Sequence, residues 1–231
     1  MKEIAPAVYS LGHGKGGHVH AFLVDAGAEL SLVDTLFEGD AQLVLEAIRA
    51  LGRSPADLKR IALTHAHRSH LGGLATLKRE TKARIYAHAW EADIVAGERR
   101  AQPVTLLPRQ SLRLIPFQVG LRFNVPRHRP CPVDEELVDG DAFGPFQVLH
   151  TPGHSPGHLS FWWEEHRFLV AGDAVATWPS VSGGWTAFNL NRTEHAKSLR
   201  RMAAFDAHVV GVGHGEPITE NAADTVHAVA A

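Results

Sequence analysis

Short apolar runs alternate with amphipathic stretches along the first part of the chain. Three runs of β-branched or apolar residues have the length and composition of strands, namely residues 19–24, 30–34 and 61–63. The segment Asp-Ala-Gly-Ala at 25–28 predicts a hairpin turn between the first two. Residues 40–51 repeat apolar side chains at the spacing of one helix face, and Gly52 predicts the end of that helix. We therefore expect strands followed by helices in this half.

The alternation of predicted strands and helices continues to residue 96 and resumes after residue 134. Further helices are predicted at residues 71–80, 89–96, 193–204 and 219–229, and further strands at 84–87, 146–150, 159–163, 167–171 and 208–212. Residues 97–134 are rich in proline and arginine, and helices and central strands tolerate proline poorly. We therefore expect an irregular insertion there, acting as a lid or an oligomer contact. No linker divides the chain, which favours a single domain over residues 1–231.

Composition narrows the class of protein without naming an activity. The net charge of the 231-residue chain is −2, so no overall basic field favours nucleic acid. The chain has no apolar stretch long enough for a signal peptide or a membrane span, and its one cysteine, Cys131, fits a reducing compartment. We therefore expect a cytoplasmic protein that binds neither nucleic acid nor a membrane. Histidine, with 16 residues, is the residue type in clear excess.

The histidine excess includes one short, dense motif. Residues 64–73 read Thr-His-Ala-His-Arg-Ser-His-Leu-Gly-Gly and follow the apolar run that ends at Leu63. Imidazole is the commonest protein ligand for zinc and related ions, and such an ion needs several ligands that converge on one point. His65, His67 and His70 therefore predict a metal-binding loop at the end of a buried strand.

Three later positions repeat the arrangement of a polar side chain after an apolar strand. His154 lies in a tight Thr-Pro-Gly-His turn, Asp173 follows an apolar run at the end of its strand, and His214 stands between two glycines. Loops at the C-terminal ends of strands gather into sites in layered α/β proteins, so we expect these side chains to join the first cluster. His158 shares the turn of His154, but His154 is the better candidate.

Together these blocks resemble the metallo-β-lactamase fold superfamily, whose motif is His-x-His-x-Asp-His followed by a distant His, an Asp and a final His. The resemblance covers essentially the whole chain and implies an α+β fold, an αββα sandwich of two mixed β-sheets flanked by helices, with metals at one edge. Asp34 resembles an acidic residue that supports the ligands from behind. Position by position, the implied ligands are His65, His67 and His154 at a first site and His70 and His214 at a second, with Asp173 shared.

Ser69 departs from that motif, because the superfamily places a catalytic, metal-binding aspartate at this position. A neutral hydroxyl is a poor zinc ligand and a weak base, so the second site is expected to bind its ion less tightly. Three explanations are open. The chain is a natural variant with one tightly held ion or a rebuilt second site, an engineered replacement, or an inactivated relative that keeps the metal scaffold only for stability.

The activity that the resemblance implies is that of a metal-dependent hydrolase. A metal-bound hydroxide attacks a lactone, thioester, β-lactam or related ester, and the ions stabilise the charge on oxygen. Length and motif order are most similar to glyoxalase II-like and lactonase-like members. Zinc, as one or two ions, is the expected cofactor, with iron or manganese as alternatives. The second activity class is a persulfide dioxygenase-like oxidoreductase with a single iron on His65, His154 and Asp173.

Two segments are candidates for shaping a small-molecule substrate pocket. Trp178, Trp185 and Phe188 follow Asp173, so their rings are expected at the pocket mouth. The apolar residues of the 97–134 insertion suit a lipophilic ester such as an acyl-homoserine lactone, whereas its arginines suit an anionic substrate such as a glutathione thioester. Both interpretations stay open at this point. Apolar side chains in that insertion also make a homodimer a candidate assembly.

Overall fold

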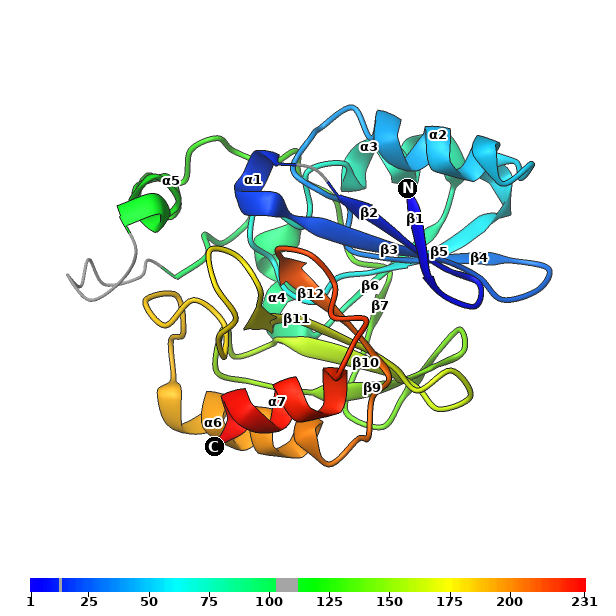
Figure 1. Cartoon of the computed structure of the whole chain (residues 1–231). Helices are drawn as coiled ribbons and strands as arrows, with labels where there is room; N and C mark the ends of the chain where they lie inside the picture. The colour runs from blue at the N-terminus through cyan, green and yellow to red at the C-terminus, as the bar shows by residue number, and fades with distance from the viewer. Residues whose placement is uncertain (13, 103–111) are drawn as a thin grey trace.

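Two β-sheets stacked face to face form the centre of the molecule (Figure 1). The computed structural model describes residues 1–12, 14–102 and 112–231. The first sheet contains, in spatial order, β1 (Lys2–Ala5), β2 (Val8–Gly12), β3 (His20–Asp25), β4 (Leu30–Val33), β5 (Leu58–Ala62), β6 (Arg84–Ala87) and β7 (Glu135–Glu136). The second contains, in spatial order, β12 (Val209–His214), β11 (Phe168–Ala176), β10 (Leu159–Trp163), β9 (Phe146–His150) and β8 (Ala142–Phe143).

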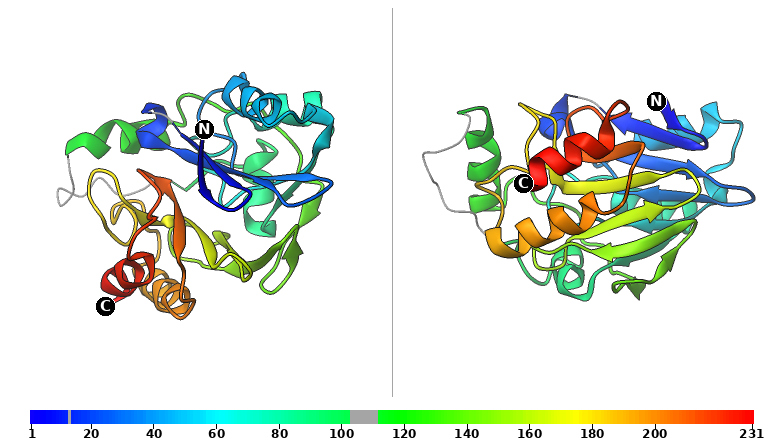
Figure 2. Two further views of the ribbon diagram at one scale, coloured as in Figure 1. Left: turned by 45° about the vertical axis from the view of Figure 1, so that its right-hand side comes forward. Right: turned by 60° about the horizontal axis from the view of Figure 1, so that its bottom comes forward.

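Both sheets are mixed, and helices cover their outer faces (Figure 2). Strands β4 to β7 run parallel, as do β11 and β12, while the other neighbours run antiparallel. The helices are α1 (Lys15–His18), α2 (Gln42–Ala50), α3 (Leu74–Thr81), α4 (Ala89–Val95), α5 (Ile115–Phe123), α6 (Arg192–Ala203) and α7 (Ala222–Ala230). Helices α2, α3 and α4 pack on the first sheet, and α6 and α7 pack on the second. The predicted αββα sandwich is confirmed.

Alternation along the strands builds this layering. In β3, Leu23 points toward the helices of the first sheet, while Phe22 and Val24 point into the space between the sheets. In β11, Val170 joins that inner layer and Leu169 packs against the helices of the second sheet. Successive side chains of a strand face opposite sides, so strands with apolar residues at every position are covered on both faces.

The structure differs from the sequence-based expectation in two segments, one at the N-terminus and one within residues 97–134. The hairpin of β1 and β2 was not expected, and α5 lies within the insertion predicted to be irregular. Helix α5 tolerates Pro116 because that residue lies in the first turn, where a backbone N–H has no partner within the helix. Residues 103–111 of the insertion lie outside the described residues.

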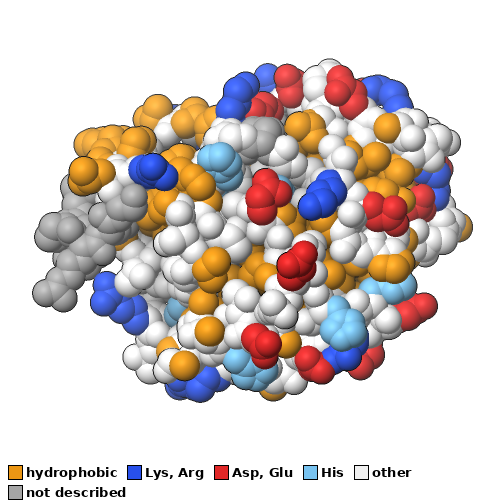
Figure 3. All heavy atoms as spheres, viewed as in Figure 1, with side chains coloured by type: hydrophobic (Ala, Val, Ile, Leu, Met, Phe, Trp, Pro, Cys, Tyr) orange, Lys and Arg blue, Asp and Glu red, His pale blue; other side chains and the backbone are white. Residues whose placement is uncertain are grey.

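Apolar side chains gather on the outer surface of α5, at the left of the molecule (Figure 3). Ile115, Val119 and Phe123 are exposed on this helix, four residues apart, and therefore lie on one face of it. Its opposite side packs through Phe117 and Leu121 onto the segment that follows β11. Among the described residues, we find no helix with the length and apolar character needed to cross a membrane.

Candidate metal centre

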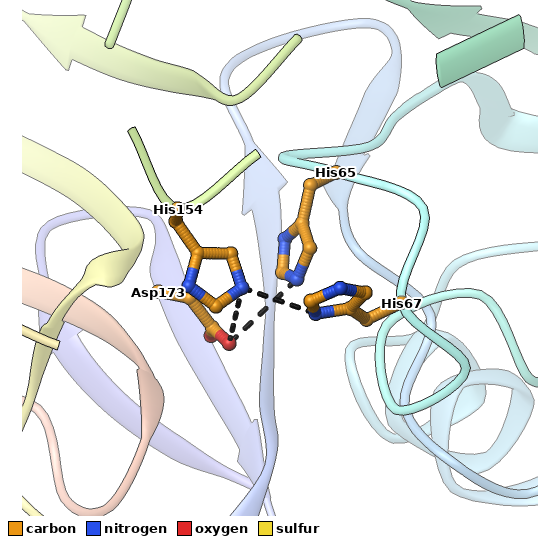
Figure 4. Close-up of side chains that lie close together, drawn as sticks. All are labelled: His65, His67, His154 and Asp173. Carbon is orange, nitrogen blue, oxygen red and sulfur yellow. Dashed lines mark hydrogen bonds and ion pairs between the residues drawn. The ribbon is translucent and has the colours of Figure 1, made fainter. Parts of the chain in front are cut away.

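Four side chains from both sheets converge on one point at the edge of the sandwich (Figure 4). One ligand atom from each of His65, His67, His154 and Asp173 lies within 4.8 Å of the others. The Nε2 atom of His154 is 3.0 Å from Nδ1 of His67 and 3.4 Å from Oδ2 of Asp173. The Nε2 atom of His65 is 3.6 Å from the same carboxylate oxygen. His67 is half-buried, and the other three side chains are buried.

A second group adjoins the first through the same carboxylate. Ligand atoms of His70, Asp173 and His214 also lie within 4.8 Å of one another, and all three side chains are buried. The Nε2 atom of His70 is 3.2 Å from Oδ1 of Asp173, and that of His214 is 3.3 Å from Oδ2. The structure therefore brings together all six residues proposed as ligands and places Asp173 between the two groups.

Asp34 orients one histidine in each group. Its Oδ2 atom accepts a hydrogen bond from Nδ1 of His70 at 2.9 Å. The same oxygen accepts a hydrogen bond from the Thr64 hydroxyl at 2.8 Å, and that hydroxyl in turn accepts from Nδ1 of His65 at 3.0 Å. A carboxylate behind an imidazole fixes both its tautomer and its orientation. Both histidines therefore direct Nε2 toward Asp173.

Two further histidines are held in the same way from other parts of the chain. Nδ1 of His154 donates to Oδ1 of Asn189 at 3.3 Å, and Nδ1 of His214 donates to the Gly17 carbonyl at 2.8 Å. With Nδ1 protonated, Nε2 of a neutral imidazole has a free lone pair. Four of the five imidazoles in the cluster are therefore anchored by Nδ1 and direct Nε2 toward Asp173.

Several buried polar atoms in this cluster lack hydrogen-bond partners. They are Nε2 of His65, Nε2 of His70 and Oδ1 of Asp173. A buried polar atom without a partner costs free energy, and a bound ion is one of the few arrangements that removes this cost. The three atoms converge with the other donor atoms of both groups, and neutral imidazole and carboxylate suit zinc and related ions. The cluster therefore fits a metal centre.

Burial and neighbouring charges set the protonation states of the cluster. Burial lowers the pKa of His65 and His154 well below 6.5, so both imidazoles are neutral at pH 7. Burial alone would raise the pKa of Asp173, but the surrounding histidines, His214 and His70 foremost, lower it well below 3.8. His65 and His154 are therefore neutral and Asp173 is ionised, the forms in which these side chains bind metals.

His70 behaves differently from its neighbours. Burial would lower the pKa of His70, but the carboxylates of Asp173 and Asp34 outweigh that effect and raise the pKa to about 10. These two carboxylates therefore favour the protonated form of the imidazole while no metal is bound. A metal ion at this position therefore competes with a proton for the imidazole.

Close backbone packing brings Asp173 into the centre. Asp173 lies inside β11 and not at the end of its strand, as the sequence had suggested. The preceding Gly172 has φ +53°, and the pairing of β11 with β12 shifts register around it. On β12, a Cβ atom at Gly213 would lie 1.9 Å from Oδ1 of Asp173, so only glycine fits there. The bulge and this glycine together make room for the carboxylate.

His158, the other histidine of the His154 turn, supports the centre without joining the two groups. Its Nε2 accepts the backbone N–H of Asp173 at 3.2 Å, and its Nδ1 is 2.9 Å from the Thr151 hydroxyl. Burial lowers the pKa of His158 to about 3, which keeps the ring neutral and Nε2 available as an acceptor. His158 was the weaker candidate of this turn, and the structure gives it a supporting role. Thr64 and Asn189 are supporting residues for which the sequence carried no distinct signal, since neither has a side chain typical of a metal ligand.

A cavity of about 610 Å³ opens onto the centre. His67, Ser69, Asp173 and His214 line its inner end, so Ser69 stands at the cavity wall beside the cluster. Of the three aromatic residues predicted at the pocket, Trp185 and Phe188 line the cavity, and Trp185 stacks on His214 with ring centroids 4.0 Å apart. Trp178 packs behind them, where its carbonyl accepts a hydrogen bond from the Trp185 indole at 2.7 Å.

Comparison with known proteins identifies the family. The model of the metallo-beta-lactamase superfamily matches residues 14–214. The chain belongs to this superfamily. It is 28% identical over 216 residues to the probable metallo-hydrolase YflN of Bacillus subtilis. The aligned region covers 87% of this chain and 77% of the relative. Family membership and this geometry together indicate a metallo-hydrolase.

Two other similar proteins extend the comparison. The chain is 29% identical over 141 residues to a hydroxyacylglutathione hydrolase of Bdellovibrio bacteriovorus. The aligned region covers 59% of this chain and 41% of that enzyme. The solved structure of TTHA1623 in a di-iron-bound form superimposes with a TM-score of 0.69 at 26% identity, covering 93% of this chain and 96% of the other. The fold of this chain is therefore shared with a protein whose solved structure holds two iron ions.

Proposed function

We propose that the protein is a zinc-dependent hydrolase of small thioesters, with lactones as the second substrate class. The observation that carries this proposal is the convergence of imidazole Nε2 atoms and the shared Asp173 carboxylate at the inner end of the cavity. Three of these atoms are buried without a hydrogen-bond partner. A cluster built only for stability would pair such atoms with protein donors or acceptors.

The proposed ligands divide into a complete site and a depleted one. His65, His67 and His154 would hold the first ion together with Asp173, while His70 and His214 would hold a second with the same carboxylate. Ser69 adds no charge at the position where the superfamily motif has aspartate, so the second site has one ligand fewer. We therefore expect one tightly held ion and one that dissociates more readily.

A divalent ion held by these residues would polarise a substrate carbonyl and lower the pKa of a bound water toward neutrality. The residues of the chain supply the remaining requirements. The Nδ1 anchors keep the imidazoles in one orientation, and burial of the ligands excludes competing water from the inner end of the cavity. Without a carboxylate at position 69, no side chain there can take a proton from water at neutral pH, so water activation depends on the metal.

The cavity wall favours an acyl substrate with a polar or anionic end. Phe117 and Leu121 of α5 pack against Trp185 and Phe188, and these four side chains line its apolar part. Arg68, Arg100 and Arg127 also line the cavity, and no carboxylate lies within ion-pairing distance of them among the described residues. Guanidinium groups bind carboxylates and phosphates well. A thioester with an anionic thiol portion fits this wall, in agreement with the hydroxyacylglutathione hydrolase name of one relative.

The test combines a metal count with a substrate panel. Purified protein is analysed for bound metals, stripped with a chelator, reloaded with zinc, and assayed on a thioester, a lactone, a β-lactam and a simple ester. We expect hydrolysis that requires the metal, and loss of both bound metal and hydrolysis in His65→Ala. His227→Ala, which changes an exposed histidine on α7, is the matched control. Metal-independent turnover, or full metal binding by His65→Ala, would contradict the proposal.

A further inference from the structure

A buried carboxylate lies behind the metal-binding loops, and among the described residues it forms no hydrogen bond or ion pair with the side chains of the proposed ligands. Glu91 belongs to α4 and is 2% exposed. Burial raises its pKa, and within the described residues no lysine or arginine forms an ion pair with it. An acidic side chain buried without a cationic partner is costly, so the contacts that retain it are informative.

The hydrogen bonds of Glu91 join two loops that belong to different sheets. Oε2 accepts the backbone N–H of Ala66 at 3.1 Å, midway between His65 and His67. Oε1 accepts the hydroxyl of Ser155 at 2.5 Å and the backbone N–H of Gly157 at 3.2 Å. The first loop follows β5 of the seven-stranded sheet, and the second follows β9 of the five-stranded sheet. One carboxylate therefore bridges the loops that carry the three histidines of the first site.

We propose that Glu91 is a positioning residue that sets the spacing between His154 and the pair of His65 and His67, and thereby the metal affinity of the first site. The inference rests on the proposed function only to the extent that this site holds a metal. Both carboxylate oxygens face N–H or O–H donors, so an acceptor is needed at each of them. Glutamine has the same shape, but its NH₂ group is a donor and would face an N–H or O–H donor of one loop, so the hydrogen bond to that loop would be lost.

The packing around Glu91 supports the same role. A Cβ atom at Gly157 would lie 2.8 Å from Cγ and 2.9 Å from Oε1 of Glu91, so glycine is what allows this close approach. Ser155 is adjacent to His154, and Ala66 is adjacent to both His65 and His67. Displacing either loop by a few tenths of an ångström would move imidazole nitrogens relative to one another, and a metal site responds steeply to ligand geometry.

The experiment measures zinc affinity by chelator competition and the visible spectrum of the cobalt-substituted protein. For the first site, we expect about tenfold weaker zinc binding in Glu91→Gln and up to about 100-fold in Glu91→Ala, as for other groups that support ligands from behind. The cobalt bands should shift, because they report ligand geometry and not fold stability. Gly157→Ala tests the same bridge from the opposite side and should weaken zinc binding without changing the carboxylate.

The matched control is Asp134→Asn. Asp134 also accepts a backbone N–H, that of Ile85, and pairs with Lys78, but it lies outside the metal centre. We expect this variant to lose stability and retain wild-type zinc affinity and cobalt bands. Wild-type affinity and bands in folded Glu91→Gln and Gly157→Ala would overturn the inference.

The outcomes separate this inference from the proposed function. If the wild type binds zinc but hydrolyses no substrate, the proposed function is wrong and the role of Glu91 is still decided by the affinities. If the wild type hydrolyses thioesters and the Glu91 variants keep its affinity and bands, the inference alone is wrong. A wild-type chain that binds no metal contradicts both.

Discussion

Asp34 shows how much one side chain contributes to the centre. It has φ +63°, and its two oxygens accept three hydrogen bonds, from the Thr64 amide, the Thr64 hydroxyl and Nδ1 of His70. Through Thr64 it also reaches Nδ1 of His65. One carboxylate thus orients a histidine of each group, which explains why a residue that is not itself a proposed ligand stands so close to both.

Replacing this carboxylate should weaken both sites. In Asp34→Asn, an NH₂ group at the position of Oδ2 would face two donors, the Thr64 hydroxyl and Nδ1 of His70. With the amide flipped, the NH₂ group would face the backbone N–H of Thr64 instead. We expect zinc affinity to fall about 10- to 100-fold, measured by chelator competition. Asp139→Asn, at an exposed carboxylate paired with Arg201, is the control and should keep wild-type affinity. Equal zinc affinity in Asp34→Asn and the wild type would contradict this role.

Ser69 is the residue that we propose limits the second metal site. Ser69→Asp places a carboxylate at the cavity wall beside His67, Asp173 and His214. We expect the number of zinc ions retained after dialysis to rise from one toward two, because the second site gains a charged ligand. Elemental analysis measures the metal content, and Ser69→Asn, similar in size but neutral, is the control. If Ser69→Asp retains no more zinc than Ser69→Asn, the second site is not limited by this position.

At the scale of elements, the close approach of β11 and β12 decides where Asp173 sits. The register of these parallel strands shifts around Gly172, and Gly213 on β12 leaves the space that the Asp173 carboxylate fills. The loop after β5 and the turn after β9 then bring histidines to the same point from both sheets. The centre therefore depends on strand packing as much as on the loops that carry the ligands.

Gly213→Ala should disrupt this arrangement. The added Cβ atom would overlap Oδ1 of Asp173, so the carboxylate or the strand must move. Overpacking of this kind costs about 1–3 kcal/mol of folding free energy, and here it should also remove tight zinc binding. Urea unfolding and chelator competition measure the two effects. Gly39→Ala, where a Cβ atom would meet its nearest atom at 3.8 Å, should change neither. Wild-type zinc affinity in Gly213→Ala would show that the centre tolerates this displacement.

At the scale of the whole molecule, histidines buried at the edge of the sandwich make the free energy of unfolding depend on pH. Burial lowers the pKa of His158 to about 3 and that of His67 to about 4, both from an unperturbed 6.5. In the unfolded chain these side chains take up protons below about pH 6.5, whereas in the folded chain they do so only near pH 4 or below. Because the unfolded state binds more protons in this window, acidification favours unfolding.

We expect the metal-free protein to lose about 2 kcal/mol or more of unfolding free energy between pH 7 and pH 5. His70, with its pKa raised to about 10, is protonated in both states below pH 6.5, so its contribution is nearly constant below that pH. Urea unfolding at the two pH values measures the difference. Zinc should add stability at pH 7 and less at pH 5, because protons compete for the same imidazoles. Equal unfolding free energies at pH 7 and pH 5 would contradict this account.

Sequence alone predicted the class of fold, which the structure confirms, and the six candidate ligands, which the structure brings together. The spacing of His65, His67 and His70 is local, so a single loop after a strand carries it whatever the rest of the chain does. The later His154, Asp173 and His214 follow predicted strands in a fixed order, and strand alternation reports two covered sheets. These signals depend on neighbouring residues, which is why they can be read without the tertiary structure.

Only the tertiary structure decided how the ligands are held. Asn189 and the Gly17 carbonyl come from segments far in sequence from His154 and His214, which they contact, and Glu91 reaches the backbone of the histidine loop from α4. No local pattern marks these residues. Helix α5 was missed because its proline in the first turn resembles a helix breaker when read without the hydrogen-bond ladder. Such contacts arise from long-range packing of the two sheets, and this packing brings histidines from separate loops together with a defined geometry.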